Sequence, residues 1–279
     1  MKIGAIIQAR MSSTRLPGKI TKELPYGSGI TALGQVIGRL KKCGSLDEII
    51  VATTTDKTDA GVPGLAKKAG AKAFRGPLED VLARYYLAAS KFRLDIVVRI
   101  TADCPCVDPE LVDALVRRHL ETRADYTANV VKLTYPDGFD IEVFGFAALE
   151  TAYEQAREVS DREHVTSYLR NHPKLFKIVS CEAPAGFRLP EMRVTLDTAE
   201  DYTLLCAVYD YLYSPRKAFT FREVTRLLEK KPWLQLINQR SLAKQVFKDR
   251  QAELKRAIAV LELQELGGAA AVLKKRLKK

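Results

Sequence analysis

Two patterns of apolar and polar residues alternate along the first 120 residues. Nearly continuous apolar runs predict strands that are buried on both faces, as in a parallel sheet. Apolar residues at helical spacing lie between these runs and predict amphipathic helices. The strands are expected near 2–9, 48–54, 71–75 and 95–101, and the helices over 31–42, 59–69, 78–92 and 109–122. Such βαβ units predict an α/β fold with a mostly parallel sheet between layers of helices.

After residue 123 the pattern becomes less regular and predicts an inserted region over 123–190 on the substrate side. Its short strands are expected near 125–131, 139–144 and 176–181, and its helices over 146–157 and 161–171. A strand near 192–196 and a helix over 199–213 complete a main domain, which we place at 1–215. Residues 216–279 are expected to form a basic helical extension, with helices over 220–231 and 249–266.

A polar loop follows the first predicted strand directly. Within ten residues it contains three cations, three hydroxyls and a glycine: Arg10, Ser12, Ser13, Thr14, Arg15, Gly18 and Lys19. Because ligands bind at the carboxyl ends of parallel strands, this loop is interpreted as a cradle for a polyphosphate. It has the glycine spacing of neither the P-loop nor the dinucleotide-binding motif. A solvated basic turn is the alternative, which we disfavour because so many cations repel one another without an anion.

Two carboxylates follow predicted strands further along the chain. Asp103 comes just after the strand near 95–101, and Asp197 just after the strand near 192–196. Mg²⁺ in proteins is usually held by one or two carboxylates together with substrate phosphates and water. The two residues are therefore predicted to share a metal ion, although an aspartate at either position is also common as a turn or capping residue.

These segments resemble a known family. The run from Ala5 to Lys19, the segment Arg99-Ile-Thr-Ala-Asp103-Cys-Pro and the Leu-Asp-Thr segment around Asp197 are similar to the cytidylyltransferase-like family of spore coat polysaccharide biosynthesis protein F. That family is related to the enzymes that make CMP-activated acid sugars. The resemblance implies a Rossmann-like, three-layer nucleotide-diphospho-sugar transferase fold. Ala199 stands where the relatives usually have proline, which leaves the carboxylate of Asp197 unaffected.

The resemblance also implies roles for single residues. The catalytic residues would be Arg10, Lys19 and Asp103, and the metal ligands Asp103 and Asp197. The nucleotide would contact Gln8, Ala9, Arg10, Ser12, Ser13, Arg15, Lys19, Arg75, Gly76 and Asp80. The sugar would contact Asp140, Glu142 and His164.

Several of these residues also have a purely structural interpretation. Asp80 and Arg84 are spaced for an ion pair on one helix, and alternation along a solvated strand explains Asp140 and Glu142 equally well. His164 fits a helix-packing histidine as well as a substrate ligand. His119 and His172 are expected on the surface, with no assigned role.

Composition narrows the class of protein further. With 279 residues, 47% of them hydrophobic and 28% charged, the chain is expected to be globular. No apolar run has the length of a membrane span, and Gln8 and Arg10 interrupt the first apolar segment, so we expect a cytoplasmic protein without a signal peptide. The five scattered cysteines are expected to be free thiols. Residues 240–279 carry 11 Lys or Arg against 4 Asp or Glu, but few aromatic residues, which favours a solvated appendage over a nucleic-acid-binding tail.

Together these features predict a Mg²⁺-dependent nucleotidyltransferase. The family resemblance implies that it transfers CMP from CTP, or a nucleotide from another triphosphate, to a hydroxyl of a sugar with release of pyrophosphate. A homodimer through the inserted region is a further expectation. A glycosyltransferase on the same fold is one alternative, although the residues after Asp103 lack the D-x-D motif typical of those enzymes. A nonenzymatic basic module that binds nucleic acid or a protein partner is the other.

Overall fold

The computed structural model describes residues 1–239, 241 and 250–277. Contacts divide the chain into two compact units, Met1–Arg240 and Ser241–Lys279, which are described here separately. No helix among the described residues is long and apolar enough to cross a membrane.

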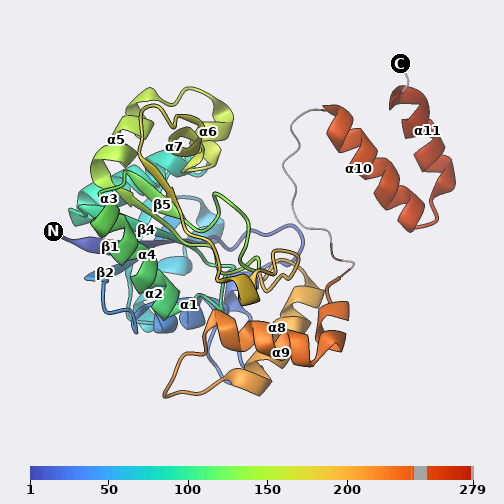
Figure 1. The fold of residues 1–279 in the computed structure, drawn as a ribbon, viewed down its shortest axis with the longest axis horizontal. Helices are drawn as coiled ribbons and strands as arrows, with labels where there is room; N and C mark the ends of the chain where they lie inside the picture. Colours follow the sequence, from blue (N-terminus) through green and yellow to red (C-terminus); the bar gives the residue numbers. More distant parts are fainter. Residues whose placement is uncertain (240, 242–249, 278–279) are drawn as a thin grey trace. The chain divides into compact units, whose positions relative to one another are not determined.

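A seven-stranded sheet forms the centre of the first unit (Figure 1). Its strands, in chain order, are β1 (Ile3–Gln8), β2 (Glu48–Thr54), β3 (Lys72–Gly76), β4 (Ile96–Thr101), β5 (Tyr126–Ala128), β6 (Glu142–Gly145) and β7 (Ile178–Ser180). Their order across the sheet is β3-β2-β1-β4-β6-β5-β7. The first four strands pair in parallel, and β6 is antiparallel to both β4 and β5. The predicted α/β fold with a mostly parallel sheet is therefore confirmed.

Helices cover both faces of this sheet and complete the three layers. In the first unit they are α1 (Ala32–Leu40), α2 (Val62–Lys68), α3 (Val81–Phe92), α4 (Pro109–Thr122), α5 (Phe146–Gln155), α6 (Val159–Glu163), α7 (Ser167–Asn171), α8 (Ala199–Leu212) and α9 (Phe221–Lys230). Short 3₁₀ turns lie at η1 (Lys19–Thr21), η2 (Lys57–Asp59), η3 (Ala185–Phe187) and η4 (Pro232–Leu236).

The apolar core has two parts because each strand presents successive side chains to opposite faces. In β1, Ala5 and Ile7 pack into the cluster that includes α1, α2, α4, α8 and α9. Ile6 points the other way, into the cluster with α3, α5 and α7. The continuous apolar run of β1 is thus explained, since both faces of this central strand are buried.

Three elements differ from expectation. Residues 192–196 form no named strand. An isolated bridge between Asp137 and Arg193 and a backbone hydrogen bond from Leu196 to Asp103 join this segment to the rest of the chain. The single helix expected over 161–171 is two short helices, α6 and α7. Helix α9 packs against α8 through Val224 and Leu228, so the first unit includes residues that we had assigned to the C-terminal extension.

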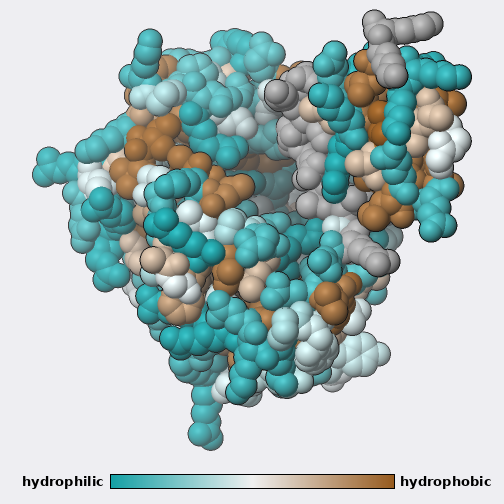
Figure 2. Space-filling model, turned by 45° about the vertical axis from the view of Figure 1, so that its right-hand side comes forward, coloured by the Kyte–Doolittle hydropathy of each residue, from teal (hydrophilic) through white to brown (hydrophobic). Residues whose placement is uncertain are grey.

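The second unit contains the helices α10 (Arg250–Leu263) and α11 (Gly267–Leu277), which pack against each other. Of its described residues, Ile258 and Ala270 are buried, whereas Leu263 and Val272 are exposed. The face drawn in Figure 2 is mostly hydrophilic, with apolar residues exposed in several places. Scattered exposed apolar residues are usual on protein surfaces and indicate no specific partner.

Candidate active site

The basic loop after β1 is held in place by its own backbone and by one buried acid. Asp59 accepts a hydrogen bond from the backbone N–H of Met11 at 2.6 Å, and the N–H of Gly18 donates to the carbonyl of Met11 at 3.2 Å. Gly18 has a φ of 65°, a conformation that glycine adopts without strain. The chain then enters η1, which begins at Lys19. The loop therefore turns back on itself and presents Lys19 at the carboxyl edge of the sheet.

The two predicted metal carboxylates come from segments that bond to each other. Asp103 lies just beyond the end of β4, and its backbone carbonyl accepts a hydrogen bond from the N–H of Leu196 at 2.8 Å. Asp197 follows Leu196 directly. Its own N–H donates to the carboxylate of Asp201, which is fully buried and also ion-paired with Arg193 at 2.5 Å. Asp201 thus fixes the backbone that carries Asp197.

Asp103 and Asp197 converge on one ammonium group. Lys19 Nζ lies 2.7 Å from Oδ2 of Asp103 and 2.8 Å from Oδ1 of Asp197. Arg15 Nη2 lies 2.9 Å from the other oxygen of Asp197. Four of the predicted site residues, which span 182 positions in the chain, therefore form one charged cluster. We call Arg15, Lys19, Asp103 and Asp197 the ion cluster.

The pKa values of Asp103 and Lys19 are shifted by the charges of their neighbours in the ion cluster. Burial alone would raise the pKa of Asp103, but the charge and hydrogen bond of Lys19 hold it below its ordinary value. Burial would likewise lower the pKa of Lys19, but Asp103 and Asp197 raise it above its ordinary value. Both groups are therefore charged at neutral pH, as ligands for a cation and an anion must be.

Gln8 ends β1 beside this cluster and has an unmet hydrogen-bonding group. Its side-chain Oε1 is buried and has no hydrogen-bond partner within the described residues. A buried carbonyl oxygen without a protein partner is rare in folded proteins, so this oxygen is available to accept a hydrogen bond from a ligand or from water. Ala9 is buried next to Gln8, whereas Arg10 and Ser12 are exposed and Ser13 is half-buried.

A second group of acids lies near the cluster. Burial and the charges of Asp103 and Asp197 raise the pKa of Asp137 to about 6, although Arg193 opposes the shift. Burial and the charge of Asp137 raise the pKa of Asp140 to about 7. Sequence reasoning predicted Asp140 as a site residue but missed Asp137, because the bridge between Asp137 and Arg193 joins segments far apart in the chain.

The residues predicted beside the nucleobase have structural partners. Arg75 donates to the carbonyls of Thr54 and Asp56, both at 2.9 Å, and so joins the ends of β2 and β3. A side chain at Gly76 would come within 2.8 Å of Phe74, so packing requires glycine there. These contacts place both residues at the carboxyl edge and leave their role with a nucleotide a prediction.

Asp80 caps α3 and forms a tertiary ion pair. One carboxylate oxygen accepts from the N–H of Ala83 at 2.8 Å, and the other accepts from Nε of Arg162 at 2.9 Å. Arg84 donates instead to the carbonyls of Pro77 and Leu78, so the alternative of an Asp80–Arg84 ion pair along the helix is not what the structure has. Both oxygens of Asp80 are engaged within the protein.

Glu142 is held inside the protein. It lies in β6 with its side chain ion-paired to Arg99 and hydrogen-bonded to the hydroxyl of Tyr126. Burial would raise its pKa, but Arg99 lowers it, so the carboxylate stays charged. Because only 3% of Glu142 is exposed, a solvated strand face does not explain this residue, and its partners are protein groups.

The three histidines have different surroundings. His164 ends α6, is half-buried and lies in a region that packs on α3. His172 stacks on Tyr168 with 4.0 Å between the ring centroids. The expectation that His119 lies on the surface is wrong, because His119 is buried and its Nδ1 lies 3.1 Å from the hydroxyl of Thr127. Burial lowers its pKa.

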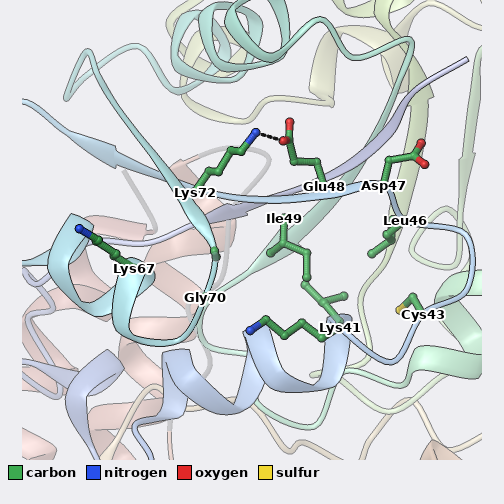
Figure 3. Close-up of a pocket in the computed structure, with 11 residues that line it drawn as sticks. Lys41, Cys43, Leu46, Asp47, Glu48, Ile49, Lys67, Gly70 and Lys72 are labelled. Atoms are coloured by element: carbon green, nitrogen blue, oxygen red, sulfur yellow. Dashed lines mark hydrogen bonds and ion pairs between the residues drawn. The ribbon is translucent and has the colours of Figure 1, made fainter.

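A concavity lies at the opposite, amino edge of the sheet, where β2 and β3 begin (Figure 3). Its volume is about 500 Å³, and its lining includes Lys41, Glu48, Lys67 and Lys72. Lys72 points toward Glu48 and pairs with it (Figure 3). This concavity is remote from the ion cluster, because β2 and β3 are parallel to β1 and begin at the edge where β1 also begins.

Comparisons with known proteins agree with this arrangement. The sequence model of the family described as Cytidylyltransferase matches residues 4–249. Over 240 residues the chain is 38% identical to the uncharacterized protein MJ1063 of Methanocaldococcus jannaschii, covering 85% of this chain and 95% of that protein. It is 37% identical to spore coat polysaccharide biosynthesis protein SpsF of Bacillus subtilis, covering 81% of this chain and 94% of that protein. A solved cytidylyltransferase structure from Leptospira borgpetersenii has a TM-score of 0.78 and 35% identity, covering 88% of this chain and all of that one.

Proposed function

The chain belongs to the cytidylyltransferase family and is a nucleotidyltransferase, and we propose that it transfers CMP from CTP to a hydroxyl of an acid sugar for polysaccharide or glycan biosynthesis. The observation that carries the proposal is the ion cluster, in which two carboxylates from separate segments meet beside a basic loop. Such a cluster suits phosphoryl chemistry, where catalysis depends on positioning and on charge neutralisation.

Asp103 and Asp197 fit a divalent metal ion. Their oxygens already lie on either side of one cationic atom, the ammonium of Lys19, so the backbone brings both to a single point. Mg²⁺ usually keeps water and takes phosphate oxygens beside one or two carboxylates, so these two residues would suffice as its protein ligands. When bound, Mg²⁺ would neutralise charge on the reacting phosphate.

The basic loop would bind the part of the nucleotide that leaves. In the reaction a sugar hydroxyl oxygen bonds to the α-phosphorus, the bond from that phosphorus to the bridging oxygen of the β-phosphate breaks, and pyrophosphate departs. Arg10, Arg15 and Lys19 would hold the β- and γ-phosphates and offset their growing charge. Ser12 and Ser13 would donate hydroxyl hydrogen bonds, and Gln8 and Ala9 would line the end of β1 beside the nucleotide.

The base and the sugar are assigned less directly. Arg75, Gly76 and Asp80 remain our candidates for the base side, with Arg75 the most exposed of the three. For the sugar we keep Asp140 and His164. An Asp140 whose pKa is about 7 is suited to accept the proton of the attacking hydroxyl near neutral pH. Glu142 would act indirectly, by holding Arg99 in the strand next to β1.

Pyrophosphate release tests this proposal. The protein is incubated with Mg²⁺, each of the four nucleoside triphosphates in turn, and a panel of acid and neutral sugars. We expect release with CTP and an acid sugar and little with the other triphosphates. If none of the four triphosphates gave pyrophosphate, and the protein transferred the sugar of a nucleotide sugar to an acceptor, it would be a glycosyltransferase instead. Release that depends on a neutral sugar would keep the reaction and change the substrate class.

A further inference from the structure

Lys19 sits where a metal ion would have to bind. Its ammonium contacts Oδ2 of Asp103 and Oδ1 of Asp197, and Arg15 takes the remaining oxygen of Asp197. The side chains of Asp103 and Asp197 are 29% and 24% exposed, whereas that of Lys19 is only 15% exposed. The carboxylates are thus open to an ion from solvent, but the oxygens that face each other are already engaged.

The ion cluster is also neutral as a whole. Two cations and two carboxylates balance within the cluster, so its four residues offer no net negative charge to a divalent cation that enters alone. A polyphosphate carries several negative charges and would offer Lys19 and Arg15 another anion. The flexible four-carbon stem of lysine allows its ammonium to exchange one oxygen partner for another nearby.

We propose that Lys19 holds the place of the metal ion in the free protein, so that the metal binds together with the triphosphate and not before it. The proposal rests on the proposed function for the identity of the triphosphate. Polyphosphate binding draws Lys19 and Arg15 away from the carboxylates, and Asp103 and Asp197 are then free to bind the metal ion. A metal ion without nucleotide must instead compete with the ammonium for the same two oxygens.

The alternative is that Lys19 forms a permanent structural ion pair with the two carboxylates. If Lys19 served only to join β4 and the segment before α8, it would stay on both carboxylates with the triphosphate bound, and its removal would mainly weaken the fold. The two cases therefore differ in how nucleotide changes the affinity for the metal ion, which involves no catalytic step.

Mn²⁺ binding tests the difference, with the free ion followed by its electron paramagnetic resonance signal. Without nucleotide, we expect Lys19→Met to bind Mn²⁺ at least about tenfold more tightly than the wild type. The control Lys174→Met removes an exposed lysine from another part of the chain and should match the wild type. Equal affinity in Lys19→Met and the wild type would overturn the proposal, and so would tighter binding in both variants alike.

The wild type gives a second test that needs no variant. By calorimetry it should bind CTP in the presence of EDTA, and it should bind Mn²⁺ at least about tenfold more tightly with CTP than without, after correction for Mn²⁺ bound to free CTP. Equal Mn²⁺ affinity with and without CTP would refute ordered entry. Thermal melting adds a check, since Mn²⁺ should raise the melting temperature of Lys19→Met more than that of the wild type.

These measurements separate the two proposals. They contain no sugar and no turnover, so they report only the competition between Lys19 and the ion. Tighter Mn²⁺ binding by Lys19→Met, without pyrophosphate release from any triphosphate, would support the competition and refute the transferase. Pyrophosphate release by the wild type, without tighter Mn²⁺ binding by Lys19→Met, would support the transferase and refute the competition.

Discussion

The two edges of the sheet both place lysines beside carboxylates, but they use the carboxylates differently. At the amino edge, Asp47 accepts a hydrogen bond from the N–H of Ile3 at 2.8 Å, and Glu48 pairs with Lys2 and Lys72. These acids bind separate partners. At the carboxyl edge, Asp103 and Asp197 face the same ammonium. A concavity of about 500 Å³ lies at the amino edge, yet the convergent charges lie at the other.

The comparison teaches that charged side chains converging on one point, and not the presence of a concavity, identify the site. Parallel strands end together at one edge, and the chain must leave them there by loops that are free to carry polar residues. The amino edge receives the chain from helix ends, where lysines are favoured by the helix dipole, as Lys41 at the end of α1 and Lys67 at the end of α2 illustrate (Figure 3). A basic concavity there has a structural explanation.

The largest effect should come from the buried pair behind the ion cluster. Asp201→Ala leaves Arg193 without its partner and removes the acceptor for the N–H of Asp197. We expect the free energy of unfolding to fall by about 3–5 kcal/mol, measured by urea denaturation and circular dichroism. The exposed neighbour Glu200→Ala is the control and should cost less than about 1 kcal/mol. Equal losses in the two variants would mean that burial does not distinguish these acids.

The next effect is on catalysis and compares the two edges directly. Asp103→Asn should lower the rate of pyrophosphate release by about 10²–10³-fold, because it removes a ligand of the metal at the reacting phosphate. Asp47→Asn at the amino edge makes the same chemical change and should leave the rate unchanged. Thermal melting of both variants checks that they are folded. A similar loss of rate in Asp47→Asn would contradict the assignment of the site to the carboxyl edge.

How much of this site the sequence predicts depends on how far apart along the chain the contacting residues lie. Asp103 was predictable because an apolar run marks β4, and a parallel sheet places the residue after that strand at the ligand-binding edge. The backbone hydrogen bond from Leu196 to Asp103 could not be predicted, since residues 192–196 form no regular strand and are held by a few isolated hydrogen bonds. Asp197 was predicted from its place after an expected strand near 192–196 and from the resemblance to a family, although the structure has no strand there.

The polar partners were the least predictable part of the fold. Arg99 and Glu142 meet because β4 and β6 are neighbours with these two residues in register. Asp80 and Arg162 lie 82 positions apart and pair only because α6 packs on α3. Local spacing allowed an Asp80–Arg84 ion pair and a solvated face for Glu142 as alternatives to ligand binding, since it reports only on contacts within one element. Tertiary pairing decides which carboxylates remain available for a ligand.

A smaller effect should appear in the pH dependence of stability. The pKa of Asp140 is raised to about 7 in the folded protein, so the folded state binds more protons than the unfolded state between about pH 4 and 7. The free energy of unfolding should therefore fall as the pH rises through this range, by at most about 1.4 kcal/mol per pH unit for this group. Asp140→Asn should flatten the curve and be more stable than the wild type at pH 8. Parallel curves would show that Asp140 does not titrate in this range.

The smallest effect should follow from the ion pair in the amino-edge concavity. The side chain of Lys72 is 57% exposed, and Glu48 keeps Lys2 at 2.8 Å when Lys72 is removed. Lys72→Met should therefore change the free energy of unfolding by less than about 1 kcal/mol and leave both the turnover number and the KM for CTP unchanged. Lys19→Met is the matched lysine at the carboxyl edge and should change Mn²⁺ affinity and turnover together. If Lys72→Met also altered the KM for CTP, the amino edge would take part in nucleotide binding, and the separation of the two edges would fail.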